Sequence, residues 1–363
     1  MLSVWESQFP EVLEQLKNES MTPLHHQAVT FYKKHFIRML INKSNMKRLR
    51  KISEKRVGSV SADLIRYLYH EIDWKQRLIL IRGARGAGKT TLLLQRLKAL
   101  DQEGIYFSLD DFYFESNRLL LTIEHLYNQG TRYFFLDELH QYLHWSIDLK
   151  NLYDHYPDIY IVGTGSSVLQ IDKGKADLSR RATTYHLNGL SFREFLIFEK
   201  GINFNPIPLT EILQNHTDHS AIINDQVDVL PMFKEYLNYG VYPFFKSHKS
   251  TYHQKFQQII QLTTEIDIPA VENINYATIR GMNQLLYVLS QIVPYTPNIQ
   301  KLADKIGVPR NSILRSLDLL QKGGLLNLLY MENKGIPQAF IAADGLRNGS
   351  KNKIPLWLFG FLY

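Results

Sequence analysis

The chain has 363 residues and no cysteine; 45% of its residues are hydrophobic, and its formal net charge at pH 7 is +7. This composition is typical of a soluble globular protein of one or two domains, and the lack of cysteine excludes disulfides, thiolate metal sites and a cysteine nucleophile, which fits a cytoplasmic protein. The longest late apolar run, residues 354–363, is about half as long as a membrane-spanning helix, so we expect no membrane partner.

Residues 1–45 contain no recognisable chemical motif, and a cluster of basic residues lies at 43–56. This cluster contains seven lysines and arginines and one glutamate, so it carries nearly all of the net charge of the chain. A local basic patch can bind phosphates. A solvated charged linker or helix face would have the same composition, and the sequence leaves both interpretations open.

Four apolar segments of strand length alternate with helix-length segments in the part of the chain that we assign to the first domain, residues 46–200. The four segments are RLILI at 77–81, IYFSL at 105–109, RYFFL at 132–136 and IYIVG at 159–163. Strands that alternate with helices predict an α/β domain in which a parallel sheet is covered by helices on both faces.

A glycine-rich loop follows the first of these strands. Residues 83–90 read GARGAGKT and match the phosphate-binding pattern GxxxxGK[ST] between a strand and a helix. The glycines let backbone N–H groups turn toward a β-phosphate, and the helix that begins near Lys89 directs its positive end toward the same place. We therefore expect ATP and Mg²⁺ as ligands, with Lys89 on the β- and γ-phosphates and the Thr90 hydroxyl on the metal.

Two carboxylates end the third strand. RYFFL is followed by Asp137 and Glu138, and ligands of open α/β sheets bind at the carboxyl ends of the strands. Asp137 is expected to hold Mg²⁺ through water, and Glu138 is expected to act as the general base that activates the attacking water.

Further candidates lie beyond the fourth strand. Its end is rich in hydroxyl groups, and we expect Ser166 to contact the γ-phosphate or the attacking water; a turn that caps the next helix is the alternative. Arg180 and Arg181 are candidates for a transition-state cation that acts on the nucleotide of the same or a neighbouring subunit. A pair of exposed surface arginines would have the same pattern.

The rest of the chain is predicted to be mainly helical. We assign residues 201–290 to a helical lid or linker that is interrupted at GVYPFF (240–245), and residues 291–336 to a helix-turn-helix-like segment with Gly307 in its turn and a hairpin after Gly324. A DNA or protein partner would bind residues 298–324. The residues that would face a DNA groove are Arg310, Asn311, Ser312 and Arg315.

The motifs together resemble bacterial and archaeal AAA-type P-loop ATPases whose core is followed by a conserved domain of unknown function. The resemblance rests on GARGAGKTTLL, FLDELHQYLHW with the strand that follows, KADLSRRA, LNGLSFREFL and FKEYLNYGVYPFF, and it covers roughly residues 46–336. It implies that Asp137 and Glu138 act in metal and water handling, and that Ser166 and the arginines near 180 complete the site. The nucleotide-binding residues that it implies are Gly83, Ala84, Arg85, Gly86, Ala87, Gly88, Lys89, Thr90 and Thr91.

The chain departs from the family pattern at both ends. Residues 1–45 precede the usual start, and we expect them to be either an extension that is not native to the family or the result of a mis-assigned start. Residues 337–363 do not read like the family, so we expect an atypical tail on a C-terminally truncated member.

The sequence thus predicts an enzyme, an Mg²⁺-dependent ATPase whose turnover drives a conformational switch. The alternative is a nucleotide-gated module that binds DNA or protein with little or no turnover. Oligomerisation is compatible with both.

Overall fold

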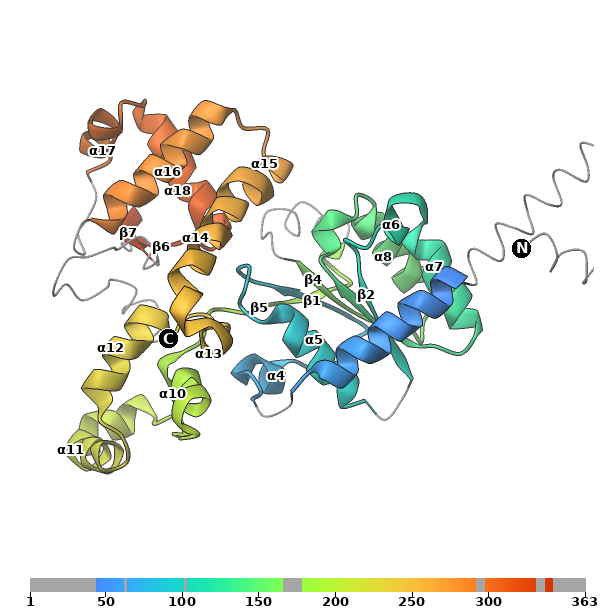
Figure 1. Cartoon of the computed structure of the whole chain (residues 1–363), viewed down its shortest axis with the longest axis horizontal. Helices are drawn as coiled ribbons and strands as arrows, with labels where there is room; N and C mark the ends of the chain where they lie inside the picture. Colours follow the sequence, from blue (N-terminus) through green and yellow to red (C-terminus); the bar gives the residue numbers. More distant parts are fainter. Residues whose placement is uncertain are drawn as a thin grey trace, which may run out of the picture. The chain divides into compact units, whose positions relative to one another are not determined.

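The computed structural model describes residues 44–61, 64–100, 103–165, 178–291, 298–330 and 337–341. The chain divides into two units, residues 1–59 and 60–363. In the first unit the described residues 44–59 form one helix (Figure 1). Its basic side chains Lys47, Lys51 and Lys55 are exposed. The described part of the basic cluster is therefore a helix that presents charge to solvent.

A five-stranded parallel sheet organises the first half of the second unit (Figure 1). The strands lie in the order β2-β3-β4-β1-β5, and each pairs in parallel with its neighbour. Their bounds are β1 Leu78–Arg82, β2 Gly104–Ser108, β3 Tyr133–Asp137, β4 Tyr160–Gly165 and β5 Thr183–His186. The predicted α/β class is confirmed, and four of the strands coincide with the four apolar segments.

Helices connect these strands. The chain crosses from β1 to β2 in one direction along the sheet and returns through β3 to β4 in the other, so right-handed connections put α5 on one face and α7 and α8 on the other. The helix α5 packs against β2, β3 and β4, and α7 packs against α8. The bounds are α4 Tyr67–Glu71, α5 Lys89–Lys98, α6 Tyr113–Ser116, α7 Leu119–Asn128, η1 Leu139–Gln141 and α8 Trp145–His155.

The position of β1 inside the sheet, between β4 and β5, explains why its sequence is apolar without alternation. Leu78, Ile79, Leu80 and Ile81 are each at most 1% exposed, because a strand covered by helices on both faces must bury every side chain. The edge strand β5 is only half-buried. Its sequence TTYH is polar but rich in residues that favour strands, which is why hydrophobicity alone did not predict it.

The second half of the unit is helical up to residue 291. The helix α10 begins at a capping box in which Ser191 and Glu194 each bind the other's backbone N–H. The predicted interruption lies between α12 and α13. The bounds are α10 Phe192–Lys200, α11 Leu209–Gln226, α12 Val229–Tyr239, α13 Phe245–His248, η2 Lys249–Thr251, α14 Tyr252–Leu262, the π-helical turn η3 Thr263–Asp267, α15 Ile268–Val271 and α16 Tyr276–Ser290.

Two further helices and a small sheet follow. The helices α17 (Ile299–Ile306) and α18 (Arg310–Lys322) are joined by a short turn at Gly307, whose φ of 77° is a left-handed conformation that glycine adopts without strain. The strands β6 (Leu326–Tyr330) and β7 (Pro337–Ile341) pair antiparallel. None of the helices in these described ranges combines the length and apolar character needed to cross a bilayer.

Candidate active site

The loop between β1 and α5 owes its shape to three glycines. Gly86 and Gly88 have φ values of 84° and 97°, which side chains with a Cβ rarely adopt. Gly83 is in ordinary backbone space, but a Cβ atom there would lie 2.2 Å from the carbonyl oxygen of Leu187. The loop therefore packs directly on the end of β5 and leads into α5, whose first turn offers free N–H groups to an anion.

Lys89 opens α5 and lies inside the loop. Its ammonium donates hydrogen bonds of 2.9 Å to the carbonyl oxygens of Gly83 and Ala84, and the residue is only 5% exposed. Burial lowers the pKa of Lys89 below its ordinary value. The side chain is thus held at the loop by acceptors that a phosphate could replace. Thr91, in the same first turn of α5, is exposed.

Several hydrogen bonds hold the Asp137 carboxylate at the carboxyl end of β3. It is 3% exposed and accepts hydrogen bonds from the hydroxyls of Thr90 at 2.6 Å and Tyr106 at 3.0 Å. The hydroxyl of Thr164, from β4, also donates to it. Residues from α5, β2 and β4 therefore converge on the end of β3 and fix the carboxylate beside the loop.

Glu138 follows with a backbone conformation that is unusual outside glycine. Its φ is 54°, and it is the one non-glycine residue in the described chain with a positive φ. Its Oε2 lies 3.3 Å from Nδ1 of His140, whose side chain is 3% exposed. Burial lowers the pKa of His140 to about 4, so this imidazole is neutral at pH 7. Strain of this kind is common where a side chain must be aimed.

The helical region contacts the loop at several points. Arg85 forms an ion pair of 2.9 Å with Asp267, the last residue of the π-helical turn η3. An added Cβ at Gly86 would approach Ile259 of α14 and Phe244 to within 3.1 and 3.2 Å. π-Helical turns are rare and frequent at functional positions. The loop is thus tied to residues that are remote in sequence.

A buried arginine that precedes β1 in the sequence also supports the loop. Arg66, just before α4, donates to the Ala87 carbonyl oxygen at 2.6 Å and to those of Asn188 and Gly189 at 2.9 and 3.0 Å. It also forms a 2.7 Å ion pair with Glu194. Burial alone would raise the pKa of Glu194, but Arg66 and two backbone N–H groups hold it below its ordinary value. This network joins the loop to the start of α10.

Three of the predicted site residues remain. Ser166 lies outside the described residues. Arg180 and Arg181 precede β5 and lie at the edge of the sheet opposite the loop, separated from it by the length of β5, roughly 13 Å. Arg181 forms a 2.7 Å ion pair with Asp154 of α8, and Arg180 is exposed. A transition-state role for either arginine stays a prediction.

Sequence reasoning missed several residues of this site. Arg66 and Asp267 carry no local motif, and their partners are 128 and 182 residues away. Thr164 was passed over in favour of Ser166, although a hydroxyl at the end of the strand beside β3 was the right signal. His140 stands two residues after Glu138 in the sequence, where a nitrogen donor could have been considered as a partner for Glu138.

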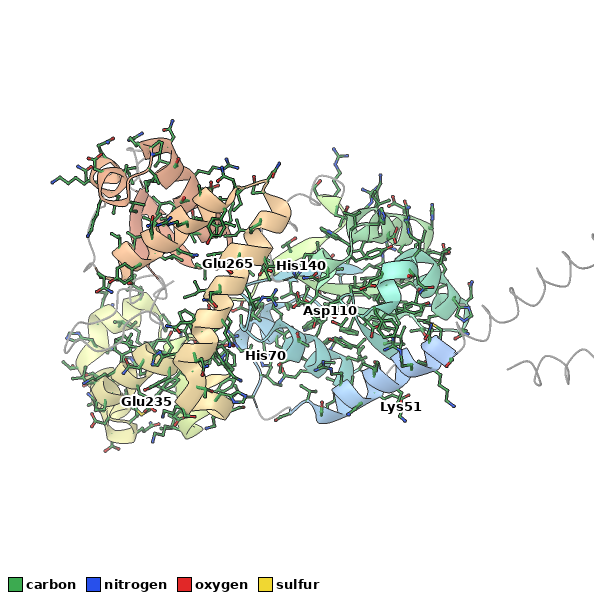
Figure 2. The ribbon with its side chains drawn as sticks, turned by 45° about the horizontal axis from the view of Figure 1, so that its top comes forward. Lys51, His70, Asp110, His140, Glu235 and Glu265 are labelled. Carbon is green, nitrogen blue, oxygen red and sulfur yellow. The ribbon has the colours of Figure 1, made fainter. Side chains whose placement is uncertain are left out.

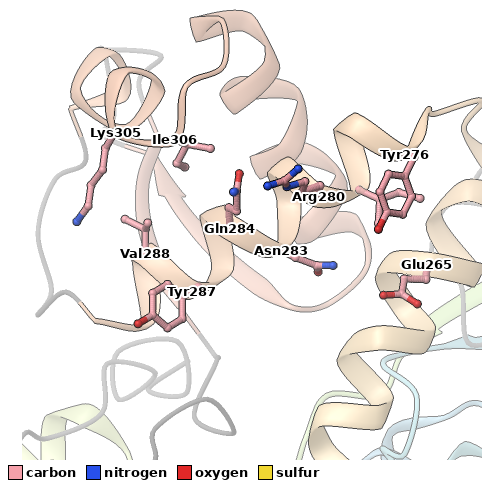
Figure 3. Close-up of a pocket in the computed structure, with 10 residues that line it drawn as sticks. Glu265, Tyr276, Arg280, Asn283, Gln284, Tyr287, Val288, Lys305 and Ile306 are labelled. Carbon is pink, nitrogen blue, oxygen red and sulfur yellow. The ribbon is translucent and has the colours of Figure 1, made fainter.

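A separate cavity of about 490 Å³ lies among α16, α17 and η3 (Figure 3). Glu265, Arg280 and Lys305 bring charge to its wall, and Tyr276 and Tyr287 bring aromatic surface. No residue of the glycine-rich loop lines it. The combination of loop, lysine and strand-end carboxylates is therefore the better candidate for a site of phosphate chemistry.

The residues beside the loop fit a nucleotide with Mg²⁺. This ion prefers hard oxygen ligands and usually binds through one or two carboxylates together with substrate phosphates. The Thr90 hydroxyl and the Asp137 carboxylate meet at 2.6 Å where the loop ends. No cluster of three or more His, Asp or Glu side chains suited to a metal occurs in the described ranges.

Comparison with known proteins gives matches of two kinds. An uncharacterized protein of Methanocaldococcus jannaschii is 29% identical over 279 residues, which are 70% of this chain and 57% of that protein. The chain thus spans little more than half the length of this curated relative. Among solved structures, the Walker-type ATPase of Pyrococcus abyssi aligns with 74% of this chain and 89% of its own, at 14% identity and a TM-score of 0.42.

A second solved structure is the RuvB Holliday junction branch migration motor of Thermotoga maritima. It aligns with 79% of this chain and 88% of its own, at 14% identity and a TM-score of 0.35. The family comparison is more direct, because residues 75–196 match the model of an AAA domain. This segment, which contains the glycine-rich loop, Asp137 and Glu138, is therefore similar to AAA domains.

Proposed function

We propose that the protein is an Mg²⁺-dependent ATPase that hydrolyses ATP to ADP and phosphate. The observation that carries this proposal is the meeting of the Thr90 hydroxyl with the Asp137 carboxylate, 2.6 Å apart, beside a lysine that is buried in the loop. P-loop enzymes hold Mg²⁺ with the same pair of residue types. Bound there, Mg²⁺ would neutralise charge on the phosphates.

Residues of the chain bind the phosphates and accept the proton of the attacking water. Backbone N–H groups of residues 83–90 bind the phosphates. The Lys89 ammonium gives up its hydrogen bonds to the two loop carbonyl oxygens and donates to phosphate oxygens instead. Glu138 accepts a proton from water as the water oxygen bonds to the γ-phosphorus. The bond from that phosphorus to the β–γ bridging oxygen breaks, and its electrons leave with ADP. Positioning and charge stabilisation supply most of the rate enhancement in such reactions.

The first experiment measures ATP binding and phosphate release with Mg²⁺ for the wild type and Lys89→Ala. We expect the variant to bind ATP about ten- to a hundredfold more weakly, because it loses charge-assisted hydrogen bonds, and to lose turnover. Lys98→Ala, at the exposed end of the same helix, is the matched control and should behave as the wild type. Equal ATP affinity in all three proteins would contradict the proposal.

The contacts of the loop support a coupling between hydrolysis and the helical region. Arg85 lies in the loop and is paired with Asp267 of η3. Phosphate oxygens would compete with Asp267 for this guanidinium, since both are strong acceptors for arginine. We propose that nucleotide binding breaks this ion pair and lets η3 and α14 move, and that phosphate release restores it.

Asp267→Asn tests the coupling. The change removes a carboxylate that competes with phosphate for Arg85, so we expect ATP affinity to rise about three- to tenfold, as measured by titration. Asp225→Asn makes the same chemical change at an exposed position of α11 and should leave the affinity unchanged. An unchanged or weaker affinity in Asp267→Asn would show that the ion pair does not compete with nucleotide.

A nucleotide-gated binding module is the second candidate, and one feature favours it. Arg310, Asn311, Ser312 and Arg315 are all exposed on the first turns of α18, where a recognition helix would contact DNA. A guanidinium nitrogen of Arg315 lies 3.8 Å from a carboxylate oxygen of Glu272, and this carboxylate offsets part of the positive charge of Arg315. Duplex DNA binding, measured at two salt concentrations with and without ATP, tests this function, and its absence in both states would exclude DNA as the partner.

A further inference from the structure

Glu138 is followed by a short turn that brings two polar side chains to it. The 3₁₀ turn η1 begins at Leu139 and is closed by a 2.9 Å hydrogen bond from the Gln141 N–H to the Glu138 carbonyl oxygen. The turn folds the imidazole of His140 back, so that Nδ1 lies 3.3 Å from Glu138 Oε2. Figure 2 labels His140. The carboxylate therefore has an imidazole partner from its own turn.

The other ring nitrogen of His140 faces the side-chain amide of Gln141, from which we infer the tautomer. The Nε2 atom of Gln141 lies 3.1 Å from Nε2 of His140. An amide nitrogen can only donate a hydrogen bond, so the imidazole nitrogen facing it must accept. The single ring proton of a neutral imidazole then belongs on Nδ1, which is the nitrogen that faces Glu138.

We propose that His140, held by Gln141 as the Nδ1–H tautomer, is a positioning residue that donates a hydrogen bond to Glu138 and thereby orients the carboxylate toward the attacking water. This inference rests on the proposed ATPase function. Glu138 needs such a partner because its side chain starts from a left-handed backbone and is 21% exposed, so its rotamer is not fixed by packing alone. The arrangement supplies the orientation on which a general base depends.

The surroundings of His140 suit a neutral donor. Its side chain is 3% exposed and lies 3.3 Å from the Glu138 carboxylate. The other charged groups that act on its pKa are Asp267, Arg85, Lys89 and Asp137. The positive and negative charges offset one another, and burial dominates and keeps the ring neutral at pH 7. A neutral donor orients the carboxylate without the strong loss of basicity that a cationic partner would cause.

Replacement of His140 separates positioning from packing. Asparagine places its amide N–H near the position of Nδ1–H and keeps the hydrogen bond, whereas leucine fills the buried site without a donor. We expect His140→Leu to lower kcat about tenfold or more and His140→Asn to stay within about threefold of the wild type. Both variants should bind Mg²⁺ and ATP with wild-type affinity, because neither change touches the phosphate-binding residues.

The coupling of His140 to Glu138 is measured by a double variant. In a Glu138→Gln background, where no base remains to be aimed, His140→Leu should cause no further loss of turnover. The idea is overturned if His140→Leu retains the kcat of the wild type, or if His140→Asn loses as much activity as His140→Leu while ATP binding is intact. A wild type that binds ATP without turnover would instead overturn the proposed function, and this inference with it.

A second readout does not depend on activity. The ¹⁵N chemical shifts of the imidazole nitrogens differ between protonated and unprotonated nitrogen, and the signals of His140 are identified by their loss in His140→Asn. We expect the proton on Nδ1 in the full chain near pH 7, and a partial transfer to Nε2 in Gln141→Leu. A proton on Nε2 in the wild type would overturn the inference, whatever the kinetics.

Discussion

Glu138→Gln is expected to lower kcat for ATP hydrolysis at least about a hundredfold, while ATP affinity stays within about threefold of the wild type. Glutamine has nearly the same shape as glutamate, but its amide cannot take a proton from water. The Asp137 carboxylate and its hydroxyl donors are untouched, so the phosphate and metal ligands remain. Steady-state phosphate release and ATP titration measure the two quantities.

The matched control is Glu115→Gln, which makes the same change at an exposed position of α6 and should retain full turnover. Retention of turnover in Glu138→Gln would assign the general base to another group and contradict the role proposed for this residue. A loss of ATP binding that accompanies the loss of turnover would contradict it as well, because Glu138 would then hold nucleotide rather than activate water.

Arg66→Met is expected to destabilise the second unit by about 3–5 kcal/mol, because it leaves the buried carboxylate of Glu194 without its counter-ion. It also removes the donor to the Ala87 carbonyl oxygen, so ATP affinity should fall together with stability. Denaturant unfolding at neutral pH and ATP titration of the folded variant measure the two effects.

Arg132→Met provides the comparison for this effect. Arg132 and Asp158 form an ion pair of the same 2.7 Å length, but their side chains are 34% and 53% exposed, and such pairs contribute only about 0–1 kcal/mol. A similar decrease in the free energy of unfolding of both variants would show that burial does not govern the energy of the Arg66–Glu194 pair.

The pH dependence of stability follows from the same pair. The pKa of Glu194 in the folded protein lies below its ordinary value of 4.5, so its carboxylate binds fewer protons when folded than when unfolded. The stability that it contributes is present above pH 4.5 and is lost as the pH falls through the folded pKa. The stability difference between the wild type and Glu194→Gln should therefore be full at pH 7 and shrink below about pH 4.

The sequence predicted the parts of the protein that depend on contiguous residues. The run RLILI had to become a strand that is buried on both faces, and it is β1. The glycine spacing of residues 83–90 predicted a loop whose φ values require glycine. The carboxylates of Asp137 and Glu138 were predicted at the end of a strand, where β3 ends. In each case the information lies within a few residues, because strand burial, turn conformation and strand-end position are local properties.

The sequence by itself thus determined the α/β class, the loop and the strand-end acids, whereas the tertiary structure decided which other side chains surround them. Only the folded chain brings Arg66 to Ala87 and Asp267 to Arg85, and only the strand order places Arg180 away from the loop. The burial that keeps His140 neutral is likewise a tertiary property. The physical reason is that hydrogen bonds, ion pairs and desolvation depend on distances in space, and residues that are far apart in the chain leave no local pattern of them.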